Sequence, residues 1–405
     1  MSSDESKPRS LSDISAEYLT AAFLDAGILR HGRVIGFDSR VIGEGAGFMG
    51  EVVDLHATFS SDSDAGSSSQ SVIMKIPTAT KNRQIGQTLG VYEREIRFYR
   101  ELQPILGIRT PKHFYSAMDA TTEPETGLKA LKLMDSLPIW MIRMLLPFGN
   151  WINRNSNWHY ILMIEHLGHF RIGDQVSGCS FDESRRVLET MAQMHSQFWQ
   201  SQKLSEFKWL VPIRYIAKPT HMLFLRAIDQ FKRQHAETLT AHTIDLIDWL
   251  ESNYLTMMKA LANRPSTLIH GDFRLDNLCF DDHTGDVVLF DWQTLGVGAG
   301  GIDLAYFLSA AVGVNVSSGR TDELIEYYRG ELAKRGVHIS RDALQWDYDV
   351  SLLILLHRLV PAQFQDFLEL GEGRGTDLLD TWLERILVHV ERVNPPALLA
   401  NVPRS

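Results

Sequence analysis

The spacing of apolar and polar residues divides the chain into a strand-rich first part and a mainly helical second part. A helical period covers residues 15–26, with Gly27 as its C-terminal stop, and a second helical pattern runs from 90 to 102. From about residue 173 onward the pattern is again helical. Period-two alternation or short branched apolar runs predict strands in four segments, 33–42, 51–60, 71–77 and 158–166.

These elements predict an α+β fold of two lobes, a small β-rich lobe followed by a larger, mainly helical one. Within the helical part, residues 180–183 (Ser-Phe-Asp-Glu) form a capping box ahead of an apolar helix face. We expect a disordered tail at 1–14, the first lobe at 15–165 and the second lobe at 166–405.

The composition is that of a folded protein, with 44% hydrophobic and 22% charged residues. The 50 acidic residues outnumber the 40 basic ones, and the net charge of −10 argues against a nucleic-acid partner. Cys179 and Cys279 form neither a disulfide framework nor a zinc site. A polar N-terminus and apolar stretches that are short or interrupted by charge predict a soluble, cytoplasmic protein without a membrane partner.

A cluster of glycines, Gly43, Gly45, Gly47 and Gly50, lies between the first two predicted strands. Glycines at this density let backbone amides approach phosphate oxygens, although a tight hairpin would explain them as well. A dinucleotide-binding fold needs a helix after the glycines, whereas residues 51–59 alternate like a strand. A glycine hairpin between two strands is the arrangement of a kinase glycine-rich loop, so the cluster favours that interpretation.

Lys75 ends an apolar strand, and its charge must leave the core toward an anion or a carboxylate. The helix that follows reads Tyr-Glu-Arg-Glu-Ile-Arg-Phe-Tyr and offers two partners. Glu95 is well placed to meet Lys75, with Glu93 as the alternative. In kinases such a Lys–Glu pair holds the lysine against the α- and β-phosphates of the nucleotide.

The most specific signal is the segment His270-Gly-Asp-Phe-Arg-Leu-Asp-Asn277, followed after an apolar strand by Asp291-Trp-Gln. Asp272 and Asn277 have the D-x₄-N spacing of a kinase catalytic loop, and Asp291 lies where kinases place a metal-binding aspartate. Oxygen donors on neighbouring loops suit Mg²⁺, a hard cation. Single aspartates here would be turn residues, but the combination predicts a phosphoryl-transfer site.

These residues resemble a known family. His270-Gly-Asp with Asn277 and the later Asp291 resemble the aminoglycoside phosphotransferase/choline kinase superfamily, whose loop has Gly where protein kinases have Arg. Four further segments are similar to the ecdysteroid kinase-like branch of that superfamily: Gly-Glu-Gly-Ala-Gly-Phe from 43, Glu-Ile-Arg-Phe-Tyr from 95, Ile-Leu-Met-Ile-Glu from 161 and Met-His-Ser-Gln-Phe-Trp from 194. The resemblance covers roughly residues 35–310.

The resemblance implies a bilobal protein-kinase-like fold and an enzyme that transfers the γ-phosphate of ATP to a hydroxyl of a small-molecule acceptor. Asp272 would be the catalytic base, and Asn277 and Asp291 would bind Mg²⁺. Lys75 would hold the ATP phosphates, and Glu95 would orient it. The lobe at 15–165 would then be the nucleotide-binding lobe, and the lobe at 166–405 would carry catalysis and the acceptor.

Two backbone segments would complete the nucleotide site. The glycine cluster would lie over the phosphates, and the interlobe hinge that meets adenine would be formed by Glu165, His166 and Leu167. Asp303 occupies the position of a structural aspartate in the family, so the resemblance gives it no catalytic role.

Two alternative functions stay open. A pseudokinase would bind nucleotide without catalysis, but the intact Lys75, Asp272, Asn277 and Asp291 argue against it. A protein kinase is disfavoured because the chain lacks a His-Arg-Asp loop and an Ala-Pro-Glu segment after Asp291. The stretch at 137–157 matches no motif, and the sequence leaves the acceptor and the oligomeric state open.

Overall fold

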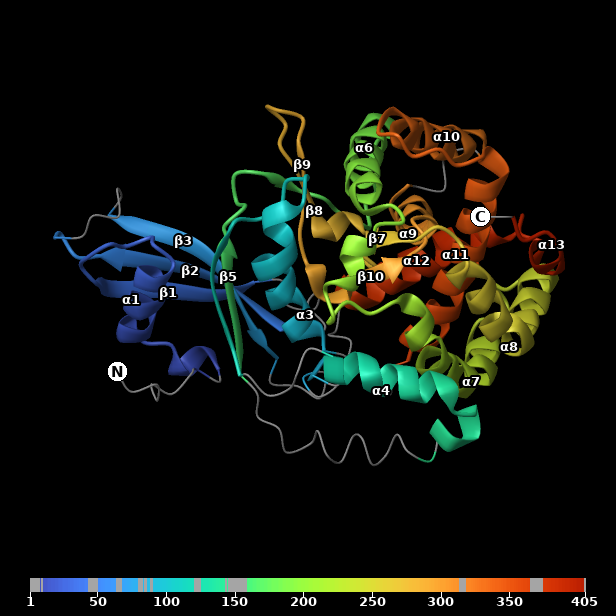
Figure 1. Cartoon of the computed structure of the whole chain (residues 1–405), viewed down its shortest axis with the longest axis horizontal. Helices are drawn as coiled ribbons and strands as arrows, with labels where there is room; N and C mark the ends of the chain where they lie inside the picture. The colour runs from blue at the N-terminus through green and yellow to red at the C-terminus, as the bar shows by residue number, and fades with distance from the viewer. Residues whose placement is uncertain are drawn as a thin grey trace.

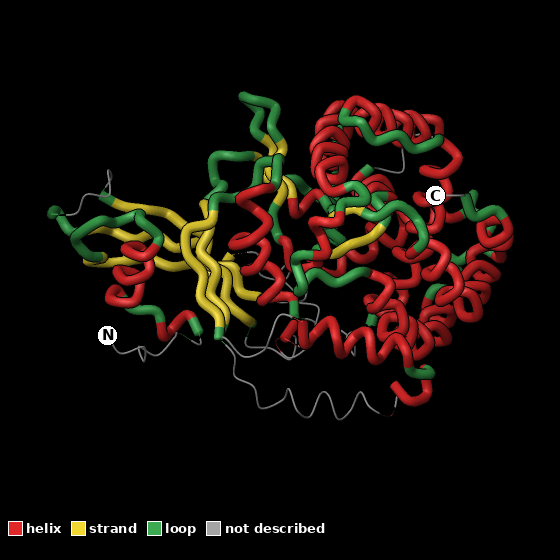
Figure 2. The backbone as a smooth tube through the Cα atoms, viewed as in Figure 1, coloured by secondary structure: helices red, strands yellow, loops and turns green. Residues whose placement is uncertain are grey.

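The computed structural model shows two lobes, a smaller one built on a sheet and a larger one built of helices (Figure 1). This arrangement confirms the predicted α+β, bilobal fold. Figure 2 shows most of the strands gathered in the smaller lobe and the helices filling the larger one. The structure describes residues 8, 10–42, 50–62, 68–78, 83, 86–87, 90–119, 125–142, 144, 159–312, 318–364 and 374–403.

The smaller lobe contains a five-stranded antiparallel sheet with the strand order β1-β2-β3-β5-β4. Lys75 on β3 lies opposite Val52 of β2 and Leu162 of β5. Strand β4 has no counterpart among the predicted elements, because most of its side chains are only partly buried and its apolar pattern is weak. The strands are β1 (Val34–Ile42), β2 (Gly50–Phe59), β3 (Ser69–Pro77), β4 (His113–Met118) and β5 (Tyr160–Glu165).

The two faces of this sheet pack against different partners. On one face, α1 (Ala16–Asp25) closes a small core that includes Ile161 and Met163 of β5. On the other face, Leu162 packs in a large core that contains α3 (Val91–Arg97) and extends through the helical lobe. Both faces of β5 are therefore buried, which explains its continuous apolar run. Helix α3 lies between the sheet and the helical lobe, so it connects the two.

The beginning of the first lobe differs from the prediction. Residues Leu11–Asp13 form a 3₁₀ turn capped by Ser10, and Ile14 is buried in the small core. Residues 10–14 therefore belong to the first lobe, because the apolar side chain of Ile14 has a site on the sheet. At the other end of the lobe, α3 continues as a π-helical turn, Phe98–Leu102.

The larger lobe is organised around α11, which packs against α7, α9 and α12. Side chains on all sides of α11 are buried, so it is a central core helix rather than an amphipathic surface helix. After α3, the α-helices of the described chain are α4 (Glu125–Ser136), α6 (Phe181–Phe198), α7 (Ala217–Gln234), α8 (Ala241–Ala262), α9 (Gly301–Ala311), α10 (Ser318–Lys334), α11 (Arg341–Ala362), α12 (Arg374–Val390) and α13 (Pro395–Ala400).

The predicted capping box begins α6. Ser180 Oγ accepts a hydrogen bond from the Glu183 amide, and the Glu183 carboxylate accepts one from the Ser180 amide. Across the described residues, the structure contains no helix that is both long enough and apolar enough to span a membrane.

Short strands carry the motif residues of the helical lobe. β8 pairs with β6 and β9, while β7 pairs with β10. The segment 270–277 follows β7, and Asp291 follows β9, so both motifs leave the ends of strands near the first lobe. These strands are β6 (Arg171–Ile172), β7 (Thr267–Ile269), β8 (Leu278–Phe280), β9 (Val287–Leu289) and β10 (Gly296–Gly298).

Candidate active site

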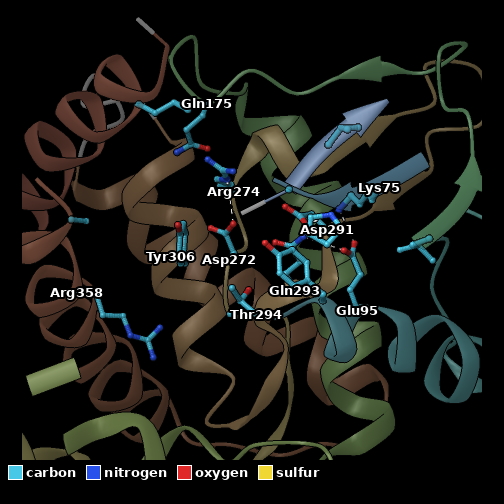
Figure 3. Close-up of a pocket in the computed structure, with 18 of the residues that line it drawn as sticks. Lys75, Glu95, Gln175, Asp272, Arg274, Asp291, Gln293, Thr294, Tyr306 and Arg358 are labelled. Carbon is cyan, nitrogen blue, oxygen red and sulfur yellow. Dashed lines mark hydrogen bonds and ion pairs between the residues drawn. The ribbon is translucent and has the colours of Figure 1, made fainter. Parts of the chain in front are cut away.

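A cavity of about 340 Å³ lies between the two lobes. Strands β2, β3 and β5 and helix α3 line it from one lobe, and the motif segments line it with α9, α11 and α12 from the other. Figure 3 shows Lys75, Glu95 and Asp291 close together, with Asp272 nearer to the helices. Residues far apart in the sequence therefore meet around one space, and four of the predicted site residues line it: Lys75, Glu95, Asp272 and Asp291.

Lys75 is held between two carboxylates. Its Nζ lies 2.7 Å from Glu95 Oε1 and 2.8 Å from Asp291 Oδ1. Glu93, the alternative partner, pairs with Arg97 on its own helix instead. Burial acts to lower the pKa of Lys75, but the charges of Asp291 and Glu95 outweigh it and raise that pKa. The lysine therefore stays charged in the cavity.

The two carboxylates differ in their surroundings. Burial opposes the ionisation of Asp291, but Lys75 and then Arg274 hold the pKa of Asp291 below its usual range. Burial raises the pKa of Glu95, whose side chain is only 3% exposed. Asp291 is thus the carboxylate that stays ionised and partly open to the cavity, as a cation ligand requires.

The Asp-Trp-Gln segment is fastened to α3 by contacts that the sequence did not reveal. Gln293 Nε2 donates to Glu95 Oε2 at 3.2 Å, and Arg94 Nη1 donates to Gln293 O at 2.9 Å. The ring of Trp292 stacks on Phe98, with centroids 3.9 Å apart and an interplanar angle of 10°. The segment that carries Asp291 is therefore held against α3.

Asp272 lies at the centre of a second set of contacts. Asn277 Nδ2 donates to both the backbone oxygen and Oδ2 of Asp272 at 2.9 Å. Arg274 Nε lies 3.3 Å from Asp272 Oδ2 in an ion pair and makes no hydrogen bond within the described part of the chain. Burial, with a further contribution from the charge and hydrogen bonding of Asp272, raises the pKa of Tyr306 well above its usual value. The Tyr306 hydroxyl is therefore a neutral neighbour of the carboxylate.

Asp303 holds the backbone of the loop at 270–277. Its carboxylate accepts hydrogen bonds from the amides of His270 at 2.7 Å and Gly271 at 2.9 Å. His195 contacts the same carboxylate at 3.2 Å and Tyr328 at 2.6 Å. Gly271 has φ +80°, and a Cβ there would lie 2.6 Å from Thr294 O, so no other residue fits without strain.

Asn277 and Asp291 are brought together by the backbone. The Phe290 amide donates to Asn277 O at 3.1 Å, which places Asn277 beside the residue that precedes Asp291. Asp291 itself adopts the left-handed conformation, with φ 64° and ψ 67°, at a cost that the surrounding contacts must offset. Because Asn277 uses its Nδ2 on Asp272, its amide oxygen remains as the group able to meet a cation.

The predicted hinge residues lie apart from these contacts. The Glu165 carboxylate binds Arg109 Nη2 at 2.6 and 2.7 Å, and His166 Nε2 lies 3.4 Å from Asp54 Oδ1. Glu165, His166 and Leu167 are not among the described residues that line the cavity. Gly50 does line the cavity, while Gly43, Gly45 and Gly47 lie outside the described residues.

The site combines a lysine paired with a glutamate of a helix, an Asp-x₄-Asn loop and an ionised aspartate that faces the cavity. These groups meet between a sheet lobe and a helical lobe, which is the arrangement of a kinase-like protein. Its class is that of the small-molecule kinase-like proteins. The chain belongs to the ecdysteroid kinase-like family, whose model matches residues 44–126 and 148–340. A search of the curated proteins finds no match.

Solved structures similar to this chain include a complex of gentamicin with APH(2'')-IIa, with 14% identity over 92% of this chain and 96% of that chain and a TM-score of 0.47. A second is the aminoglycoside phosphotransferase APH(2'')-Ib bound to ADP, with 14% identity over 87% and 94% and a TM-score of 0.44. A third is a choline/ethanolamine kinase family protein from Mesorhizobium loti, with 13% identity over 91% and 93% and a TM-score of 0.46.

Proposed function

We propose that the protein transfers the γ-phosphate of MgATP to a hydroxyl group of a small-molecule acceptor. The observation that supports this most directly is the meeting of two sets of residues around one cavity. Lys75 with its two carboxylates lies on one side, and Asp272 with Asn277 lies on the other. Phosphoryl transfer needs a fixed cation near the phosphates and a carboxylate that orients the attacking hydroxyl, and this arrangement supplies both.

Each residue then has a distinct task. Lys75 binds the phosphate oxygens, and Glu95 keeps its ammonium group in place. Asp272 accepts a hydrogen bond from the acceptor hydroxyl and directs its oxygen toward the phosphorus. A carboxylate is a weak base toward an alcohol, so orienting the hydroxyl is the main contribution of Asp272, and the proton is transferred late.

Asn277 and Asp291 fit Mg²⁺ by their chemistry, since one contributes an amide oxygen and the other an ionised carboxylate. When bound there, Mg²⁺ neutralises charge on the phosphates. Two backbone segments complete the proposal. Gly43, Gly45 and Gly47 cover the phosphates, and the linker from Glu165 to Leu167 binds adenine.

The test is ADP formation by the wild type and by Asp272→Ala across a panel of hydroxylated small molecules. We expect one class of compound to stimulate turnover and the variant to lower kcat by at least ~10², the range for a positioned acid–base group. The matched control is Asp286→Ala, an exposed aspartate between the two motifs, which should keep the wild-type rate.

Other outcomes favour the alternatives. Equal rates for Asp272→Ala and the wild type would refute the assignment of Asp272. Tight MgATP binding without ADP formation in the presence of any acceptor would favour a pseudokinase. Phosphorylation of added proteins and not of small molecules would favour a protein kinase.

A further inference from the structure

The helical side of the cavity, which we call the acceptor wall, consists of the side chains from α9, α11 and α12 that line it. Most of this wall is apolar. Tyr306 of α9 stacks on Trp382 of α12, with centroids 4.5 Å apart. The aliphatic members of the wall are Ala310, Ala362, Leu378 and Leu379. A wall of this kind favours an acceptor with an apolar skeleton.

Two polar groups on and beside this wall are hydrogen-bond donors without an acceptor among the described residues. Gln175 is 3% exposed and lines the cavity, and its Nε2 has no hydrogen-bond partner in the described part of the chain. Trp382 Nε1 is likewise buried without a partner there. Unpaired buried donors are costly, so they indicate where a ligand places acceptor oxygens.

Arg358 adds a positive charge to the same wall. No residue of the described chain forms an ion pair or hydrogen bond with its guanidinium, although it is partly buried and lines the cavity. In the view of Figure 3, Tyr306 lies between Arg358 and Asp272. The charges of Arg358 and Asp272 both act on the pKa of Tyr306, Arg358 lowering it and Asp272 raising it. Arg358 and Asp272 therefore line the same cavity from different elements, Arg358 from α11 and Asp272 from the loop after β7.

None of the carboxylates that line the cavity in the described part of the chain belongs to the acceptor wall. Among the described lining residues the acids are Glu95, Asp272 and Asp291. Glu95 and Asp291 are occupied by Lys75, and Asp272 has Arg274 beside it. The charge of the acceptor wall is therefore positive, which repels an ammonium group and attracts a carboxylate.

We propose that the acceptor is a lipophilic hydroxy acid, whose skeleton packs on the acceptor wall, whose hydroxyl meets Asp272 and whose carboxylate binds Arg358. This inference rests on the proposed function and names its substrate class. A guanidinium binds a carboxylate through two parallel N–H···O bonds, and the apolar surroundings strengthen that pair. Gln175 Nε2 and Trp382 Nε1 donate to further oxygens on the acceptor skeleton.

The test compares three probes of equal length that differ only at one end: ω-hydroxydecanoate, decanediol and ω-aminodecanol. Calorimetry on the full chain without nucleotide gives the dissociation constant of each. We expect the wild type to bind ω-hydroxydecanoate at least ~10-fold more tightly than the diol, because hydrogen bonds to charged groups are among the stronger ones, and to bind the amine most weakly.

Variants locate the preference. Arg358→Glu should reverse the order, so that ω-aminodecanol binds most tightly. Arg341→Glu, an exposed arginine at the start of the same helix, should leave the order unchanged. If thermal unfolding shows that Arg358→Glu does not fold, Arg358→Gln replaces it and should remove the difference between ω-hydroxydecanoate and the diol.

Three results would overturn the substrate class: tighter binding of the amine by the wild type, the same order in the Arg358 variants, or no binding of any probe. The readout is independent of phosphoryl transfer. The expected binding order without ADP formation from any acceptor would therefore refute the proposed function alone. ADP formation driven by cationic alcohols would refute the substrate class alone.

Discussion

The two sides of the cavity are built in opposite ways. On the nucleotide side, which we define as Lys75, Glu95, Asp291 and Gln293, the charged and polar groups bind one another. On the acceptor wall, Arg358 and Trp382 Nε1 have no partner in the described chain. The groups expected to perform the chemistry are therefore held in place by the protein, whereas the groups expected to select the acceptor are completed by the ligand. Substitutions on the two sides should accordingly have different effects.

The largest effect is expected on the nucleotide side. Lys75→Met leaves Glu95 and Asp291 without their shared cation and removes the charge that meets the phosphates. We expect kcat/KM for ATP to fall about 10²–10³-fold, the cost of losing one preorganised electrostatic group. Steady-state kinetics on the variant and on Lys208→Met, an exposed lysine, provide the comparison. A loss smaller than about threefold would mean that the nucleotide side is not the preorganised one.

A smaller effect should follow from cutting the link between that side and α3. Gln293→Ala removes one of the two donors to Glu95 while keeping the Lys75 pair. Loss of one hydrogen bond of about 1 kcal/mol predicts a roughly fivefold increase in KM for ATP. Gln202→Ala, at an exposed position, is the control for the assay. An unchanged KM and kcat would show that Lys75 alone keeps Glu95 in position.

The smallest effect concerns the helices behind the acceptor wall. His389 of α12 contacts the hydroxyl of Tyr348 on α11 at 3.0 Å, and burial with the nearby Arg392 lowers the pKa of His389 to about 4. The unfolded chain, with an ordinary histidine pKa of about 6.5, takes up the proton first as the pH falls. This contribution to stability is therefore complete above about pH 6.5 and is lost as the pH falls toward 4.

Urea unfolding between pH 6.5 and 5.5 checks this contribution. We expect the free energy of unfolding of the wild type to fall by about 1 kcal/mol more than that of His389→Gln over this interval. Equal pH slopes for the two proteins would refute the role of His389.

The same contrast explains how much the sequence could predict. Lys75, Asp272, Asn277 and Asp291 lie at the ends of strands or in one short loop, so their relations depend on local spacing, and the structure brings them together. The choice of Glu95 over Glu93 follows from the helix face, because Glu93 points to Arg97 within α3. Local patterns also predict β1, β2, β3, β5 and the start of α6.

The acceptor wall could not be predicted in this way. Arg358 and Trp382 come from two helices whose relative rotation is decided by packing, and α11 is buried all round, so its sequence has no polar face to orient it. Gln293 was missed although it follows Trp292, because only the fold places it against Glu95. Tyr306 lies three positions after Asp303 on α9, a weak signal that helix geometry alone could have offered.

The stack of Trp292 on Phe98 also has a pharmacological consequence. An inhibitor that requires the Asp291 segment to swing away would have to separate these two rings and break the bond from Arg94 to Gln293. The free energy lost with these two contacts would weaken the binding of such a compound. Drug-like molecules against this protein are better designed to fill the cavity with the segment in place, and to obtain their selectivity from the helices α11 and α12.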